Sequence, residues 1–272
     1  MAVEDPPTGS AKSPDPADPS EGGALVPFDG VPFDGAADGE REARHLGLEG
    51  VVIAIVGYVV AGVVASFAVI VWAAIVGASP ADKTLGLQLS GLTGSWIGLL
   101  GVPLVAARLR GRGGPVTDLR WGFRWSDVPI GAVAGVGTAY AINVLYAPFL
   151  RHNAHLRHQF SQPAKEITKV AHNTGGKVLL SVFVVVLVPL VEESYFRGVV
   201  FRSLDRLVLT PVAVVFSGLL FGLAHLEWLQ LPALALFGVV LAALAHRTGR
   251  LGPGMVAHAA FNGLTVFQLF HR

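Results

Sequence analysis

The sequence predicts an all-α, polytopic membrane protein, and three observations lead to this fold class. Of the 272 residues, 52% are hydrophobic and only 14% are charged, against roughly 25% charged in an ordinary soluble domain. The mean hydropathy is +0.57. Apolar runs of about 17–25 residues, the length at which a helix crosses a bilayer, recur from Val51 onward. A membrane barrel would need strands of about ten alternating residues, and the sequence shows none.

Residues 1–45 differ in composition from the rest of the chain. They are rich in Pro, Asp, Ser and Gly and cannot bury a core, so they predict a disordered tail before a transmembrane helical domain over 46–272. The tandem repeat VPFDGVPFDG at 26–35 is interpreted as a low-complexity linker, with a short docking motif as the alternative. The start of the chain lacks the pattern of a signal peptide, so we expect the tail to be retained.

The apolar runs give about seven expected spans, or eight. Several contain Gly or Pro, which is tolerable in membrane helices whose neighbours satisfy the freed backbone groups. The expected spans are 51–76, 86–107, 129–150, 177–199, 210–226, 230–246 and 252–270.

Basic residues between the spans predict the orientation of the chain in the membrane. Arginines cluster after the second and fourth spans and before the seventh, and cytoplasmic loops are enriched in Lys and Arg. This pattern predicts a cytoplasmic amino terminus. Residues 151–176, on the predicted outer side, carry Arg151, Arg157, Lys165 and Lys169 and oppose that orientation.

Charge and cysteine content exclude some functions. The net charge of +1 implies no electrostatic attraction to nucleic acid. The absence of cysteine excludes disulfides, thiolate metal sites and a cysteine nucleophile.

Three ionisable residues interrupt the apolar run that begins at Val178. Charged side chains in hydrocarbon cost several kcal/mol each unless they are paired or line a wet cavity. Glu193 and Arg197 are four residues apart on one helix face, which favours an ion pair. Glu192 points about 100° away from that face and has no partner nearby in sequence.

Two other expected spans contribute polar residues that could meet Glu192. His225 lies deep in the fifth span, and His258 and Asn262 lie one turn apart in the last. A glutamate desolvated beside imidazoles can take a proton from water, so convergence of these residues predicts a hydrolytic site. Singly, each has a structural alternative: a snorkelling or interfacial group, or for Asn262 a bond to a neighbouring helix. The loop histidines are interpreted as solvated surface rather than a metal site: His152, His155 and His158.

These residues resemble a known family of membrane-embedded proteases. EESYFR fits Glu-Glu-x-x-x-Arg, FGLAH fits Phe-x-x-x-His and HAAFN fits His-x-x-x-Asn, in the order found in the CPBP family. That family includes the type II CAAX prenyl endopeptidases and the bacterial Abi proteins linked with bacteriocin immunity. The resemblance covers residues 175–270. Signatures of other intramembrane proteases, such as His-Glu-x-x-His, are missing from the sequence.

The resemblance implies an intramembrane metalloendopeptidase that acts on membrane-embedded or membrane-associated peptides. Glu192 would be the general base on water and His225 would position or polarise that water. His258 and Asn262 would stabilise the oxyanion or serve as further ligands, and Glu193 with Arg197 would support the site. Glu192, His225 and His258 with water would suit a divalent metal such as Zn²⁺. A metal-free, glutamate-activated water would use the same residues.

Two alternatives from other classes stay open. Intramembrane Glu and His residues also relay protons in transporters, although the sequence lacks two similar halves. A non-catalytic scaffold or immunity partner could retain the fold. An Ala-, Arg- and Gly-rich sequence suggests a bacterial plasma membrane and an unprenylated peptide substrate. For His225 to meet His258, we expect the fifth helix to begin outside the bilayer, near residues 204–208.

Overall fold

The computed structural model describes residues 34–110 and 115–271, and over these ranges the fold is all-α, as the sequence predicts. Five of the seven expected spans are helices long and apolar enough to cross a membrane. These five helices are Gly47–Val76, Leu85–Leu109, Asp127–Arg151, Thr174–Asp205 and Leu231–Thr248. The segment 210–226 contains a shorter apolar helix, and 252–270 is helical throughout but does not reach that level of hydropathy.

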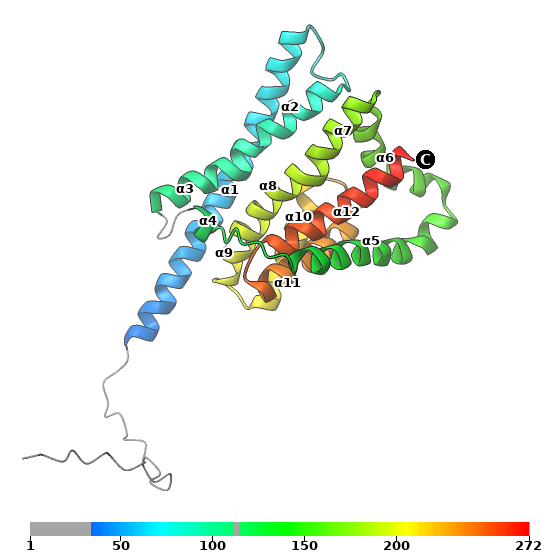
Figure 1. The fold of residues 1–272 in the computed structure, drawn as a ribbon. Helices are drawn as coiled ribbons and strands as arrows, with labels where there is room; N and C mark the ends of the chain where they lie inside the picture. The colour runs from blue at the N-terminus through cyan, green and yellow to red at the C-terminus, as the bar shows by residue number, and fades with distance from the viewer. Residues whose placement is uncertain (1–33, 111–114, 272) are drawn as a thin grey trace, which may run out of the picture.

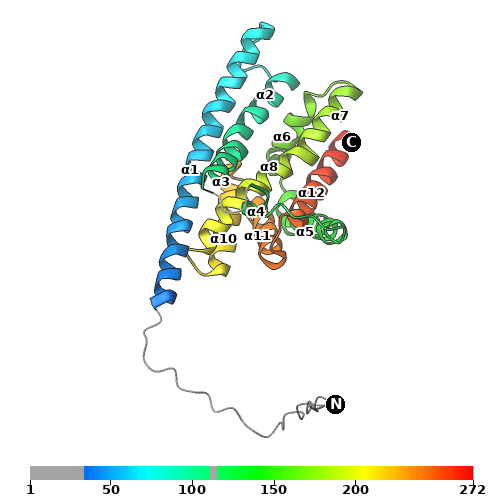
Figure 2. The same cartoon turned by 60° about the vertical axis from the view of Figure 1, so that its left-hand side comes forward.

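A long antiparallel pair forms one side of the molecule (Figures 1 and 2). It consists of α1 (Asp34–Val76) and a second helix that runs from α2 (Leu85–Trp96) through the π-helical η1 (Ile97–Gly101) into α3 (Val102–Arg110). Only 11% of the most apolar window of α1 is buried inside the protein, so this helix offers its surface to lipid. The side chain of Thr84 caps α2 by accepting a hydrogen bond from the Leu87 amide.

Helix α1 begins inside the segment that the sequence predicts to be a disordered tail. The helix begins at Asp34, so residues 34–45 are helical although they were assigned to the disordered tail. Residues 1–33, which hold most of the VPFDG repeat, lie outside the described residues, and for them the tail stays a prediction.

A single turn, α4 (Pro115–Asp118), leads into α5 (Asp127–Arg151), which runs across the base of the last helix (Figure 1). It is followed by α6 (Ala154–Lys169). We expected a loop over 151–176, and this was wrong for most of that segment. Asn153 caps α6, and the ring of Phe160 packs on Tyr146 of α5 at 4.7 Å. The sequence of α6 is too polar for a membrane span, which is why the search for apolar runs missed it.

One continuous helical rod of 32 residues occupies the centre of the bundle. It passes through α7 (Thr174–Val182), the π-helical η2 (Phe183–Leu187), α8 (Val188–Tyr195), the π-helical η3 (Phe196–Phe201) and α9 (Arg202–Asp205). Residues 193–201 are all buried. The Tyr195 hydroxyl donates to the Ala54 carbonyl at 2.7 Å and so fixes this rod against α1.

Three helices complete the bundle: α10 (Thr210–Ala224), α11 (Leu231–Thr248) and α12 (Gly252–Phe270). The expectation that the fifth helix begins near residues 204–208 was wrong. A turn over that segment separates α9 from α10, and Pro211 stands in the first turn of α10, where its missing N–H costs nothing. Because α10 is short, His225 lies at its carboxyl end rather than beyond the centre of a long span.

Candidate functional site

The predicted ion pair between Glu193 and Arg197 is present at the centre of the bundle. The Arg197 guanidinium lies 3.0 Å from the Glu193 carboxylate, and both side chains are fully buried. Arg197 also donates to the Gly238 carbonyl of α11 at 2.9 Å, and its guanidinium lies over the Phe221 ring at 4.6 Å. The pair therefore joins the central rod to both α10 and α11.

Glu193 has a second partner that the sequence did not predict. The same carboxylate oxygen lies 3.1 Å from Nδ1 of His258 on α12. An ionised carboxylate only accepts hydrogen bonds, so Nδ1 is the donor, and Nε2 has a free lone pair when the ring is neutral. Gly254 leaves the room for this contact, because a Cβ there would stand 2.9 Å from the other Glu193 oxygen. Glu193 thus orients His258 as well as holding Arg197.

Glu192 and His258 come together from α8 and α12, as the hypothesis of a common site requires. The distance from Glu192 Oε2 to His258 Nε2 is 3.8 Å, too long for a direct hydrogen bond but suited to a bridging water. Glu192 Oε2 is buried and makes no hydrogen bond within the described part of the chain. The Glu192 side chain as a whole keeps 20% of its surface exposed, so the residue is only partly enclosed by the bundle.

His225 lies beside this pair without a direct bond to it. Its Nδ1 donates to the Phe221 carbonyl at 2.8 Å, which leaves Nε2 as the acceptor nitrogen. The Phe221 ring lies 4.8 Å from the His225 ring and 5.7 Å from the His258 ring. Phe221 therefore contacts both imidazoles. Over the described residues, His225 makes no hydrogen bond to Glu192 or His258.

Asn262 joins α12 to the π-helical segment of the central rod. Its amide nitrogen donates to the Val184 carbonyl in η2 at 2.9 Å. This is the bond to a neighbouring helix that the structural alternative describes. One amide N–H of Asn262 remains for another acceptor.

The three expected metal ligands do not form a ligand group in this structure. Within residues 34–110 and 115–271, no three His, Asp or Glu side chains are close enough to share an ion. Glu192 and His258 converge, but His225 does not complete a group of three with them. The histidines of 152–158 are exposed, as expected for surface residues.

Trp121, which precedes α5, is a further contact that sequence reasoning missed. Its indole N–H donates to the Ser194 hydroxyl at 2.7 Å, next to Glu193. Ser194 in turn donates to the Leu190 carbonyl at 2.6 Å. A lone Trp in a loop carries no sequence signal for such a role, because the bond joins residues far apart in the chain.

Comparison with known proteins supports the resemblance over the carboxy-terminal third. Residues 174–264 match the family described as type II CAAX prenyl endopeptidase Rce1-like. A membrane-embedded CAAX protease, MroQ of Staphylococcus aureus, is 34% identical over 96 residues, which are 33% of this chain. The chain spans 39% of the length of that relative. No solved structure matches the chain.

The matched segment contains all seven residues that the three motifs specify, from Glu192 to Asn262. The resemblance to the Rce1-like CAAX protease family is therefore confirmed for this segment. Together with the five apolar helices, it identifies an integral, multi-pass membrane protein.

Proposed function

We propose that this chain is an intramembrane peptide hydrolase in which Glu192 takes a proton from the attacking water. The observation that supports this proposal most directly is the distance of 3.8 Å between Glu192 Oε2 and His258 Nε2. The carboxylate oxygen is buried and makes no hydrogen bond over the described residues. A water that bridges these atoms would satisfy both. The match of residues 174–264 to a CAAX protease family supports the same chemistry.

The reaction follows from the hydrogen-bonding capacity of these groups. Water bonds to the peptide carbonyl carbon through its oxygen while Glu192 takes one of its protons. Nε2 of His258 holds the water. When the ring is protonated, Nε2 donates a hydrogen bond, and the carboxylate of Glu193 stabilises the positive charge of the imidazolium. The free N–H of Asn262 is available to the oxyanion. Glu192 returns the proton to the leaving amine as the C–N bond breaks.

A second version of the proposal gives a role to His225, either directly on water or as a ligand of a metal ion. The unprotonated Nε2 of His225 could polarise water from the side of Phe221, or join Glu192 and His258 as a ligand of a divalent ion such as Zn²⁺, which would lower the pKa of bound water. The separation of His225 from the other two residues fits a water-based site better, so no step above depends on a metal. Activity that EDTA abolishes and Zn²⁺ restores would establish the metal form.

Membrane placement and substrate are parts of the same proposal. We place α10 and α12 inside the membrane region with the five longer helices, which gives seven helices, and the amino terminus in the cytoplasm. The substrate is a membrane-embedded or membrane-associated peptide, since the site lies among membrane helices. The Staphylococcus relative is a membrane-embedded CAAX protease by name, which is consistent with this substrate class.

The test compares Glu192→Gln with the unchanged protein in cells and after purification. Gln keeps the size of the side chain and removes the base, so the cleavage rate should fall about 10²-fold or more while insertion and yield are unchanged. Proteomics of membrane peptides should show termini that depend on Glu192, and peptides spanning them provide the purified assay. Glu166→Gln, on exposed α6, is the matched control and should cleave normally.

Normal cleavage by the Glu192→Gln protein would reject the proposed base. Absence of any Glu192-dependent terminus, together with proton-coupled uptake that requires Glu192, would instead favour the transporter alternative.

A further inference from the structure

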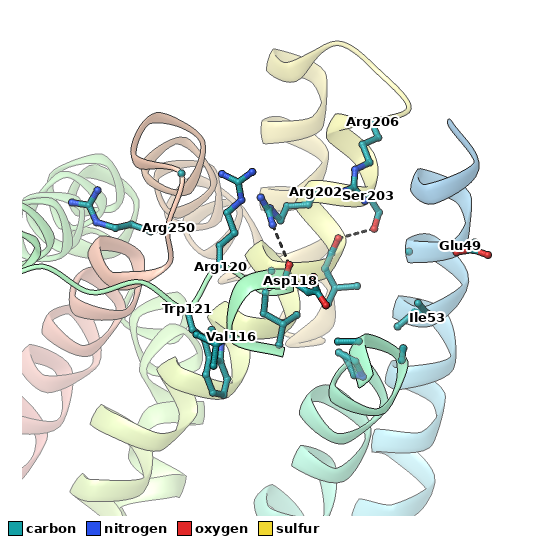
Figure 3. A pocket seen from close by; sticks show the side chains of 18 of the residues that line it. Glu49, Ile53, Val116, Asp118, Arg120, Trp121, Arg202, Ser203, Arg206 and Arg250 are labelled. Atoms are coloured by element: carbon teal, nitrogen blue, oxygen red, sulfur yellow. Dashed lines mark hydrogen bonds between the residues drawn. The ribbon is translucent and has the colours of Figure 1, made fainter. Parts of the chain in front are cut away.

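A cavity of about 730 Å³ opens at one end of the bundle, away from the residues of the proposed hydrolytic site. Its walls combine the first residues of one candidate span, Gly47–Val76, with the last residues of two others, Leu85–Leu109 and Thr174–Asp205. The segment around α4 closes it (Figure 3). The ends of three candidate spans meet there, so in a bilayer that these helices cross the cavity would lie where hydrocarbon passes into headgroups.

Three arginines line this cavity and form no salt bridge over the described residues. Arg202 comes from α9, Arg206 follows it by one turn, and Arg120 comes from the segment after α4. Arg202 is close enough to the other two for like-charge repulsion, which the attraction of Asp205 opposes less strongly than either arginine acts, and Figure 3 shows Arg120 and Arg202 directed to the same side. Over the described residues none of the three forms a salt bridge, and Arg202 donates only to a backbone carbonyl, that of Asp118, at 3.2 Å.

Over the described residues, the other charged side chains of the cavity wall form no salt bridge with these three arginines. Arg250 points away from it and pairs with Asp127 at the start of α5, at 3.1 Å from Nε to each carboxylate oxygen. Glu49 lies on the opposite wall, on α1. Repulsion among Arg120, Arg202 and Arg206 is a cost that a bound anion would remove.

Asp118 supplies a second, independent observation. Its Oδ2 atom is buried and accepts no hydrogen bond within the described part of the chain. A buried acceptor without a donor is unfavourable, so a ligand hydroxyl in the cavity, toward which the Asp118 side chain turns, would be favoured. A bare inorganic anion satisfies the arginines, whereas an anion bearing hydroxyl groups satisfies the arginines and Asp118 together.

We infer that this cavity binds the headgroup of an anionic phospholipid that carries hydroxyls, with its phosphate held by Arg120, Arg202 and Arg206. The hydroxyls donate to Asp118. The apolar wall from α1 and α3, which includes Ile53 and Ala106, receives the start of the acyl chains. Binding at this site is separate from peptide hydrolysis and does not depend on the proposed function.

The test measures lipid binding to the full chain purified in neutral detergent. Native mass spectrometry and thermal unfolding are recorded with phosphatidylglycerol, phosphatidic acid, phosphatidylcholine and inorganic phosphate. Phosphatidylglycerol should bind best and raise the melting temperature, phosphatidic acid should bind less well because it lacks the glycerol hydroxyls, and phosphatidylcholine should bind weakly. In Arg120→Gln/Arg206→Gln, affinity for phosphatidylglycerol should fall at least about tenfold, since each lost charge-assisted contact contributes about that factor.

Arg247→Gln is the matched control, because Arg247 is exposed at the end of α11 but does not line the cavity. It should bind phosphatidylglycerol normally. Equal binding of phosphatidylglycerol and phosphatidylcholine by the unchanged protein would overturn the inference without any variant. Stabilisation by inorganic phosphate but not by phosphatidylglycerol would overturn the lipid assignment and leave a site for a free anion. Phosphatidic acid binding as well as phosphatidylglycerol would overturn the role of Asp118.

Discussion

At the scale of single residues, the two adjacent glutamates have different surroundings although they look alike in sequence. Over the described residues, Glu192 has one buried oxygen without a hydrogen bond, near His258, whereas Glu193 is fully buried between Arg197 and His258. The helix face alone predicted Glu193 as a supporting residue. Its contact with Nδ1 of His258 adds a second role, because this contact sets the orientation of an imidazole that faces Glu192.

Glu193→Gln should therefore affect stability and catalysis together. It leaves Arg197 buried without its counter-ion, which costs about 3–5 kcal/mol, and it weakens the hold on His258. The melting temperature should fall, and kcat should fall by about tenfold or more, the usual scale for a lost positioning contact. Thermal unfolding and peptide cleavage measure the two effects.

The double variant Glu193→Gln/Arg197→Met separates these roles. Removing both charges should restore much of the melting temperature, since no buried charge is then left without its counter-ion. It leaves His258 without its charged acceptor, so kcat should stay low. Recovery of kcat together with stability would show that Glu193 acts on the fold alone.

At the scale of elements, the sequence predicts contacts within a helix better than contacts between helices. The Glu193–Arg197 pair follows from a spacing of four residues, and five of the seven spans follow from hydropathy. The Glu193–His258 contact joins residues 65 positions apart and depends on how α12 packs, which no local pattern records. The π-helical segments η2 and η3, which carry Val184 and Arg197, likewise have no sequence signature.

Close packing of α10 on α11 is the element-level feature that supports the site. Gly218 and Gly238 face each other: a Cβ on Gly218 would stand 2.6 Å from the Val239 amide nitrogen, and one on Gly238 would stand 2.7 Å from the Gly218 Cα. The Gly238 carbonyl is also the acceptor for Arg197. Small residues at this crossing therefore let α11 approach closely enough to hold the buried arginine.

Gly218→Ala should thus push the two helices apart and destabilise the protein by about 1–3 kcal/mol, the usual cost of overpacking. Thermal unfolding in detergent measures the loss. Gly62→Ala in α1 is the matched control, because a Cβ there meets nothing within 4 Å. Since Ala favours the helix by about 0.5–1 kcal/mol, the control should be as stable as the unchanged protein or more so. Equal stability of the two variants would argue against a tight α10–α11 crossing.

At the scale of the whole molecule, charged residues mark two opposite ends. The arginine cavity is built at the start of the first span, whereas α6 is tied to the far end of that span by the Lys83–Glu166 salt bridge at 2.9 Å. The basic residues of 151–176, which opposed the predicted orientation, belong largely to this amphipathic helix and its flanks. A helix that lies against α5 and α12 is not a free loop, so its charges are weaker evidence on topology than those of the arginine end.

The absence of cysteine makes this orientation directly measurable. Single substitutions place one thiol at each end: His155→Cys on exposed α6 and Arg247→Cys on the exposed end of α11. In intact cells, a membrane-impermeant maleimide should label His155→Cys. Labelling of Arg247→Cys should require permeabilised cells, because the arginine end faces the cytoplasm in the predicted topology. The unchanged protein, with no thiol, gives the background.

The two labelling patterns also show how many helices cross the membrane between residues 155 and 247. Opposite results at residues 155 and 247 agree with an odd number of crossings between α6 and the end of α11, as expected if the rod, α10 and α11 all span. Labelling of both positions from outside would require one of these helices to re-enter without crossing, and the fifteen-residue α10 is the shortest of the three. The reversed pattern would reject the positive-inside orientation and place the arginine cavity in the outer leaflet.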